Sequence, residues 1–344
     1  MSERYHPSPD QAALAASLAE SLASILPLSR LRASRDSCGS RASHEESAQT
    51  WQALRDLDVF AISLPEDQGG SGLGMAEEAL IAIELGRGVV APSVLATIGA
   101  GHMRSGGRAH VPGEGRVAAG YRRGGRVVFV DDAGASELLI RSPDGAELFA
   151  RPSSSRLIDE QLWSSRLLEP VELGAALVAA DPARALRLRL IDSAALAGLA
   201  QAALEMAVGY AGLREQFGRP IGSFQAVKHH CANMALSARL ACDQVSFAAV
   251  ALDDGRDDAR LQVESAFFVA GSAAVENASK NIQIHGGVGF SDEADPHRLL
   301  KRARLLLEIA GGLEAALTRL GEVPTSAELG AHRPDGRAHQ PAGG

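Results

Sequence analysis

The second half of the sequence contains four long apolar stretches with a helical period, and this feature constrains the fold most strongly. Short segments rich in Gly, Pro and Asp separate the stretches and are typical of helix ends. The chain is 46% hydrophobic but only 4% aromatic, so its helices must pack through small aliphatic side chains. We therefore predict a C-terminal four-helix domain at 182–325, with helices at 183–213, 224–252, 257–284 and 295–320.

The apolar residues of the first hundred positions also recur with a helical period, but over shorter stretches. Apolar residues recur at helical spacing over 9–26, 46–57 and 75–87, and a glycine-rich turn at 66–74 precedes the last of these. This pattern predicts an N-terminal helical domain at 1–103.

The middle of the chain instead carries short apolar runs between turns. Such runs occupy 126–130, 137–141 and 146–150, with Asp, Gly and Pro between them. We predict a shortened β domain at 104–181 with five or six strands, and a disordered tail at 326–344 after the last helix. The predicted fold class is α+β, mainly α.

The charge and cysteine patterns exclude several classes of protein. A formal net charge of -8 argues against a general nucleic-acid-binding protein, which needs a basic face. The cysteines Cys38, Cys231 and Cys242 are widely spaced and indicate neither a metal site nor a disulfide framework. We find no apolar core of a signal peptide and no window with the roughly 18 apolar residues that span a bilayer. We expect a soluble, cytoplasmic protein that does not contact a membrane.

The link between the first two long helices combines groups suited to an anion. It reads REQFGRPIGSFQ from Arg214 to Gln225 and places a guanidinium, the aromatic ring of Phe217 and an amide close together. The fork-shaped donors of arginine suit a pyrophosphate, and Gln225 begins the next helix, where the helix dipole favours an anion. Taken alone, helix capping around a buried Phe explains this segment equally well.

A second glycine-rich segment ends the third long helix. It reads QIHGGVGF from Gln283 to Phe290, and its three glycines allow a backbone to approach a ligand and offer N–H groups to oxygen atoms. A simple glycine cap explains one of these glycines well and three poorly. We expect His285 to satisfy backbone groups rather than to act as a base.

Together the two segments resemble the C-terminal domain of acyl-CoA dehydrogenases. The matching sequences are REQFGRPIGSFQAVKH at 214–229 and QIHGGVGF at 283–290, and the helix GLAQAALE at 198–205 fits the same pattern. The sequence PEDQGGSGLGMAEEALIAIELGR at 65–87 extends the resemblance to the N-terminal helical unit.

The resemblance implies a tetramer that binds FAD at its subunit interfaces. In this family the flavin takes a hydride from the β-carbon of an acyl-CoA, a carboxylate takes the α-proton, and an electron-transfer protein accepts the electrons. The two segments hold the ADP part of an FAD whose flavin ring belongs mainly to the neighbouring subunit. The residues that match the family's FAD contacts are Arg214, Phe217, Gln225, Gln283, Gly286 and Gly287.

Three departures from the family pattern concern catalysis. The commonest catalytic glutamate begins a Glu-Gly-Thr-type motif, and its place here holds Ala310 followed by two glycines. The other known place for this glutamate, on the helix before the Arg-x-x-Phe-Gly loop, falls near Leu188. The β region also lacks the family's Thr-Glu-x-Gly-Ser-type segment, and it is shorter than a complete family domain.

Two nearby carboxylates could replace the base if the local backbone is shifted. Glu308 lies two residues before Ala310, and a rotation of about 200° turns it away from the site. Asp192 lies one helical turn after Leu188 and is the weaker candidate. We therefore assign no catalytic residue and no metal ligand.

We predict that the chain is one subunit of a heteromeric acyl-CoA dehydrogenase. It would supply half of an interface FAD site, while a second acyl-CoA dehydrogenase-like subunit supplies the base. One alternative is a self-sufficient homomeric enzyme that uses Glu308 or Asp192. Another, of a different class, is a non-catalytic, flavin-poor scaffold or binding subunit. An oxygenase of the same fold would also need no base, although no residue argues for it.

Overall fold

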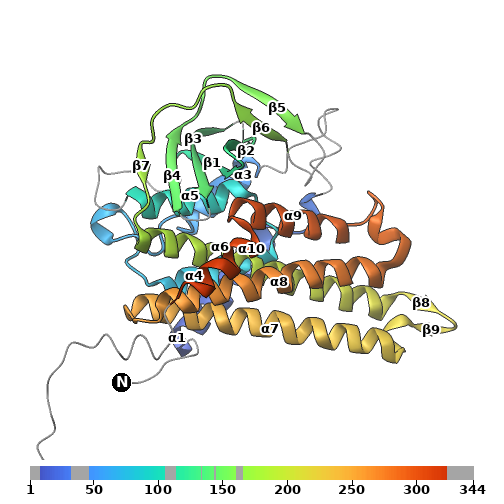
Figure 1. Cartoon of the computed structure of the whole chain (residues 1–344). Helices are drawn as coiled ribbons and strands as arrows, with labels where there is room; N and C mark the ends of the chain where they lie inside the picture. Colours follow the sequence, from blue (N-terminus) through green and yellow to red (C-terminus); the bar gives the residue numbers. More distant parts are fainter. Residues whose placement is uncertain are drawn as a thin grey trace, which may run out of the picture.

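The computed structural model describes residues 8–31, 46–104, 114–132, 134–142, 145–159 and 166–323. Long helices form one layer and a twisted sheet lies against it (Figure 1). The helical layer consists of α6 (Pro182–Leu213), α7 (Gln225–Asp253), α8 (Ala259–His285), α9 (Pro296–Ile309) and α10 (Gly312–Gly321), with the short turns η3 (Ile221–Ser223) and η4 (Gly286–Phe290).

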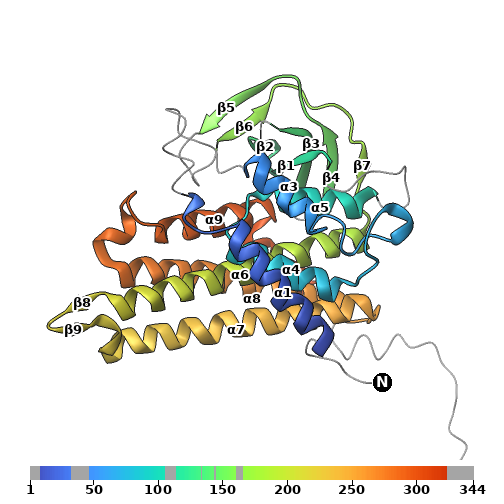
Figure 2. The same cartoon turned by 180° about the vertical axis from the view of Figure 1, so that it is seen from behind.

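Shorter helices from the first hundred residues pack against this layer and against the sheet. They are α1 (Pro9–Ile25), α3 (Ala48–Asp56), η1 (Glu66–Gln68), α4 (Met75–Arg87) and α5 (Pro92–Arg104). Figure 2 shows α1 lying across α4, and α5 running beneath the sheet. Glycines allow the closest approach in this part of the fold: a Cβ on Gly86 of α4 would lie 2.1 Å from the carbonyl oxygen of Ala195 in α6.

Within the described residues, the central sheet has seven strands in the order β5-β6-β2-β1-β3-β4-β7. The strands are β1 (Arg116–Arg123), β2 (Arg126–Val130), β3 (Ala135–Ser142), β4 (Gly145–Ala150), β5 (Ser155–Asp159), β6 (Leu167–Pro170) and β7 (Val178–Ala179). β1 and β3 are parallel, and the other neighbours are antiparallel. A separate two-stranded hairpin joins β8 (Glu215–Gln216) to β9 (Arg219–Pro220).

The strands alternate between two cores, as a period of two residues requires. In β3, Leu138 and Ile140 point into a small core on the outer face of the sheet, together with Phe129. Leu139 instead belongs to the large core shared with the helices. The next residue on that inner face is Arg141, which is buried. The sheet therefore directs a charged side chain towards the helical layer.

The observed fold confirms the α+β, mainly α class and corrects several details. The helix expected at 295–320 is divided into α9 and α10, because Gly311 and Gly312 have φ values of 94° and 80° that end the first helix. In the part of the chain that the structure describes, the sheet has seven strands rather than five or six. Helix α5 was not predicted, because all of its residues except Arg104 are buried and its apolar pattern has no polar face.

By length and composition alone, α6 and α7 are apolar enough to cross a membrane. The expectation that no stretch would qualify was wrong, since it counted only apolar residues and these windows tolerate isolated charges. In α6, 72% of the apolar window is buried within the fold, whereas in α7 only 33% is buried. Helix α7 therefore keeps an uncovered apolar face, which includes Leu236 and Leu240.

Candidate functional site

The two predicted cofactor segments lie at the same end of the helical layer. Tyr210, in the last turn of α6, stacks on His285 at the end of α8, with ring centroids 4.0 Å apart and an angle of 21° between the planes. Arg214 follows Tyr210 by four residues, and Gly286 follows His285 directly. The stack therefore joins two segments that lie about seventy residues apart in the sequence.

The first segment is an exposed hairpin with an aromatic tip. Phe217 is 91% exposed and has a φ of 56°, a left-handed conformation that is unusual for a residue other than glycine. Its ring meets Phe224 edge to face, with centroids 6.2 Å apart. The guanidinium of Arg219 lies 4.2 Å from the centre of the Phe224 ring. The alternative of a cap around a buried Phe217 is therefore wrong, because this ring faces outward.

Helix α7 begins after this hairpin and the short turn η3. Gln225 is its first residue, and no side chain caps the N-terminus of this 29-residue helix. Arg214 is exposed, and among the described residues no carboxylate forms an ion pair with it. An arginine and an uncapped helix N-terminus thus lie together at one surface, which is the chemistry that binds phosphate groups.

The second segment presents open backbone. Gly286 has φ 65° and ψ -144°, a conformation that glycine adopts most readily, and a Cβ on Gly286 or Gly287 would meet no other atom within 4 Å. The exposed amide of Gln283 accepts a hydrogen bond from Lys280 at 2.7 Å. His285 donates from Nδ1 to the carbonyl oxygen of Asn281 at 2.9 Å, as expected for a residue that satisfies the backbone.

These donors fit the ADP part of a dinucleotide cofactor. A guanidinium, helix N–H groups and glycine N–H groups are all hydrogen-bond donors, and the described segment offers them without a competing carboxylate at Arg214. All six predicted contact residues are exposed on this chain, namely Arg214, Phe217, Gln225, Gln283, Gly286 and Gly287. Exposed apolar side chains surround them, including Leu213 at 84% and Phe290 at 75% exposure. Such a surface suits a ligand that a second subunit covers.

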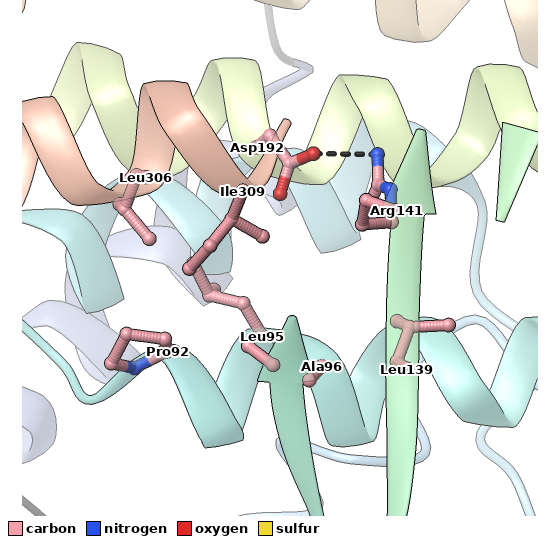
Figure 3. Close-up of a pocket in the computed structure, with 9 residues that line it drawn as sticks. Pro92, Leu95, Ala96, Leu139, Arg141, Asp192, Leu306 and Ile309 are labelled. Atoms are coloured by element: carbon pink, nitrogen blue, oxygen red, sulfur yellow. Dashed lines mark ion pairs between the residues drawn. The ribbon is translucent and has the colours of Figure 1, made fainter. Parts of the chain in front are cut away.

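A very different environment is found at the junction of the sheet and the helices. A small cavity there offers about 10 Å³ to the centre of a water molecule, which is room for roughly one water (Figure 3). Its wall comes from α5, β1, β3, α6 and α9, and consists of Pro92, Leu95, Ala96, Ala119, Leu139, Arg141, Asp192, Leu306 and Ile309.

An ion pair forms part of the wall of this cavity. Nη2 of Arg141 lies 2.6 Å from Oδ2 of Asp192, and both side chains are about 7% exposed (Figure 3). Burial raises the pKa of the Asp192 carboxyl, and the positive charges of Arg141 and Arg189 oppose that rise. Sequence reasoning ranked Asp192 as the weaker candidate base and missed Arg141, because the pairing of a strand residue with a helix residue leaves no local signal.

The two positions where the family places its catalytic base are buried in this chain. Ala310 is 1% exposed, and its carbonyl oxygen accepts a hydrogen bond from Nη1 of Arg189 at 3.1 Å. Leu188 is also 1% exposed. Arg189 pairs in turn with the buried carboxylate of Glu264 at 3.1 Å, and burial lowers the pKa of its guanidinium to about 10. A positive charge therefore lies against the backbone where the glutamate would be.

Glu308 points away from the cavity. Its carboxylate pairs with Arg123 of β1 at 3.0 Å, and the arginine side chain is 75% exposed. Glu308 itself is one-third exposed and does not line the cavity. The rotation expected from helix geometry explains this placement.

Comparisons with known proteins identify the class of fold. The sequence matches models of the acyl-CoA dehydrogenase N-terminal domain over residues 30–108 and of the C-terminal domain over residues 185–323. The chain therefore belongs to the acyl-CoA dehydrogenase family, whose members are FAD-dependent oxidoreductases. Neighbours of the same fold are described with FAD or with FADH2 bound.

Two curated relatives and two solved structures illustrate the similarity. The chain is 30% identical over 281 residues to acyl-CoA dehydrogenase IpdE2 of Mycolicibacterium smegmatis, covering 78% of this chain and 86% of that protein. It is 32% identical over 307 residues to acyl-CoA dehydrogenase FadE34 of Mycobacterium tuberculosis, covering 80% of this chain. The match spans only 42% of the length of FadE34.

The solved structures share the fold at lower identity. The steroid acyl-CoA dehydrogenase variant Tcur3481–Tcur3483 has a TM-score of 0.72 and 24% identity, covering 91% of this chain and 97% of that one. The ChsE4–ChsE5 complex from Mycobacterium tuberculosis has a TM-score of 0.70 and 21% identity, covering 96% of this chain and 100% of that one.

Proposed function

We propose that this chain is one subunit of a heteromeric acyl-CoA dehydrogenase and that it holds the ADP part of an FAD shared with a partner subunit. The observation that carries this proposal is a contrast within one chain. The surface around Arg214 and Gly286 is open and rich in donors. The position of the family's base holds the buried Ala310, beside a cavity that the ion pair of Arg141 and Asp192 lines.

Each residue of the half-site has a separate role in binding. Arg214 and the first N–H groups of α7 neutralise the pyrophosphate, and the N–H groups of Gly286 and Gly287 donate to oxygen atoms of the same ligand. Phe217 packs against the ligand or the partner, since its ring is almost fully exposed. The flavin, when bound, supplies the hydride chemistry, and the partner supplies the base that removes the α-proton.

The apolar face of α7 and the names of two structural neighbours support a partner subunit. Only a third of the apolar window of α7 is buried, which leaves a large apolar surface for a partner subunit to bury. Two neighbours of the fold are described as pairs of components, and one of them as a steroid enzyme. We extend the proposal to a bulky acyl-CoA substrate, an electron-transfer protein as acceptor and a cytoplasmic location.

The flavin content of the purified chain tests this proposal. We would measure visible absorbance per chain and acyl-CoA-dependent reduction of a dye, first for the chain alone and then after co-expression with candidate partner subunits from the same genome. We expect little flavin and no turnover alone, and both in the assembled complex. The proposal fails if the chain alone forms a homotetramer with a full complement of flavin and full turnover.

A second candidate function follows from Asp192. This carboxylate lines the cavity beside the place of the family's base, and burial raises its pKa, as is common for catalytic carboxylates. In a self-sufficient enzyme, Asp192 would take the α-proton after separating from Arg141. Flavin-dependent turnover by the chain alone that disappears in the Asp192→Asn variant, while the variant stays folded and keeps its flavin, would favour this function. A chain that never carries flavin, alone or with a partner, would favour a scaffold instead.

A further inference from the structure

Tyr210 connects both halves of the proposed nucleotide site, although it belongs to neither motif. Its ring stacks on His285, and its hydroxyl lies 3.5 Å from the carbonyl oxygen of His285. Its own carbonyl oxygen accepts a hydrogen bond from the backbone N–H of Arg214 at 2.8 Å. One residue near the end of α6 is therefore attached to the first segment by its backbone and to the second by its side chain.

The glycine turn depends on how His285 is held. Gly286 leaves α8 with a positive φ, and the turn folds back so closely that a Cβ on Gly289 would lie 2.7 Å from the carbonyl oxygen of Ile282. The imidazole of His285 is held by the Tyr210 ring on one face and by its hydrogen bond to Asn281. Both contacts hold the residue that directly precedes the turn.

We propose that Tyr210 is a positioning residue for the turn at Gly286 and Gly287, and through this turn for the ADP part of the cofactor. The inference rests on the proposed half-site and adds a residue that the family motifs do not include. The Tyr210 ring holds His285, and His285 in turn orients the two glycine N–H groups. Donors that are already oriented bind a ligand more tightly, because less conformational freedom is lost on binding.

Two substitutions separate the ring from the hydroxyl. Tyr210→Phe keeps the stack and removes only the long contact to the carbonyl oxygen, whereas Tyr210→Leu removes the aromatic ring and keeps an apolar side chain. Using the full chain and ADP as the probe, we expect the Leu variant to bind ADP about tenfold more weakly than the original chain. The Phe variant should bind within about twofold of the original chain.

Amide hydrogen exchange provides a readout that does not depend on the ligand. In the Leu variant without ADP, exchange should accelerate in the segment 286–290 and stay unchanged in 263–280 of the same helix-turn unit. The Phe variant should show the same amide exchange rates as the original chain. Faster exchange across the whole of α8 would mean general destabilisation and would overturn the positioning role, as would unchanged exchange at 286–290.

The failure of this inference is distinct from the failure of the proposed function. If the original chain binds no ADP, the half-site itself is wrong, while hydrogen exchange still decides whether Tyr210 positions the turn. If the original chain binds ADP and the Leu variant binds it equally well, the half-site stands and the role of Tyr210 is refuted.

Discussion

Gly198 of α6 lies so close to Ile83 of α4 that a Cβ on the glycine would be 1.9 Å from the carbonyl oxygen of Ile83. A real side chain is not tolerated at this distance, so the two helices must separate if one is added. This contact places α4 of the N-terminal helices directly against α6.

The first prediction concerns this contact. Gly198→Ala should destabilise the chain by about 3 kcal/mol, since overpacking against a backbone atom outweighs the better helix propensity of alanine. The matched control is Gly209→Ala on the same helix, where a Cβ would meet no atom within 4 Å. The control should be stabilising by up to about 1 kcal/mol. Chemical denaturation measures both, and equal effects at the two positions would refute the close approach.

A second prediction tests whether Arg141 and Asp192 form a structural pair. Asp192→Asn leaves a buried guanidinium without its anion and should cost about 3–5 kcal/mol of unfolding free energy. The double variant Arg141→Met with Asp192→Leu replaces the pair by apolar groups and should recover most of that loss. Urea denaturation of Arg141→Met, Asp192→Leu and the double variant checks the coupling. Additive losses would show that the two charges do not depend on each other.

Arg214 provides the third prediction. Arg214→Ala in the assembled complex should weaken FAD binding by about 10- to 100-fold, because a charge-assisted hydrogen bond to phosphate is lost. Arg239→Ala on α7 is the control, since this exposed arginine pairs with Asp243 of the same helix. Flavin released during dialysis can be measured by fluorescence. Loss of flavin from both variants alike would indicate a general charge effect instead of a site.

The fourth prediction concerns Glu308 as an alternative base. Glu308→Gln should leave turnover of the assembled complex unchanged and alter stability by less than about 1 kcal/mol, because its partner Arg123 is largely exposed. Dye-linked dehydrogenase assays and thermal unfolding measure the two quantities. A loss of turnover without loss of stability would show that Glu308 acts as the catalytic base.

The fifth prediction follows from the environment of His285. Burial lowers the pKa of this imidazole from its ordinary value of 6.5, and the hydrogen bond to Asn281 partly opposes the shift. The folded state thus favours the neutral ring, so its contribution to stability is present above pH 6.5 and is lost as the pH falls below that value. Relative to His285→Gln, the original chain should lose thermal stability between about pH 8 and pH 5. The same dependence of thermal stability on pH in both chains would contradict a neutral ring in this half-buried position.

Local patterns were sufficient to predict the class of fold and the candidate nucleotide segments. The long helices have a helical period and end at glycines or prolines, and such signals act over a few residues. The two motifs at Arg214 and Gln283 could be recognised because their groups are contiguous in the sequence. Whether these residues bind FAD stays a prediction.

Other features of the fold could not be predicted, because they depend on contacts between segments that are distant in the sequence. Helix α5 has no polar face to reveal its period, since its burial is imposed by the sheet and by α6. The break between α9 and α10 was missed although both of its glycines are visible, because an apolar pattern continues on each side of them.

The sequence by itself determined that no carboxylate stands at Ala310 or Leu188, and that the donors of the nucleotide segments are present. Only the tertiary structure decided what replaces the base: Arg189 against the Ala310 carbonyl, and Arg141 paired with Asp192 in the wall of a cavity of about one water. The physical reason is that residue types are set along the chain, whereas burial and ion pairing arise when a strand, two helices and their charges meet in space.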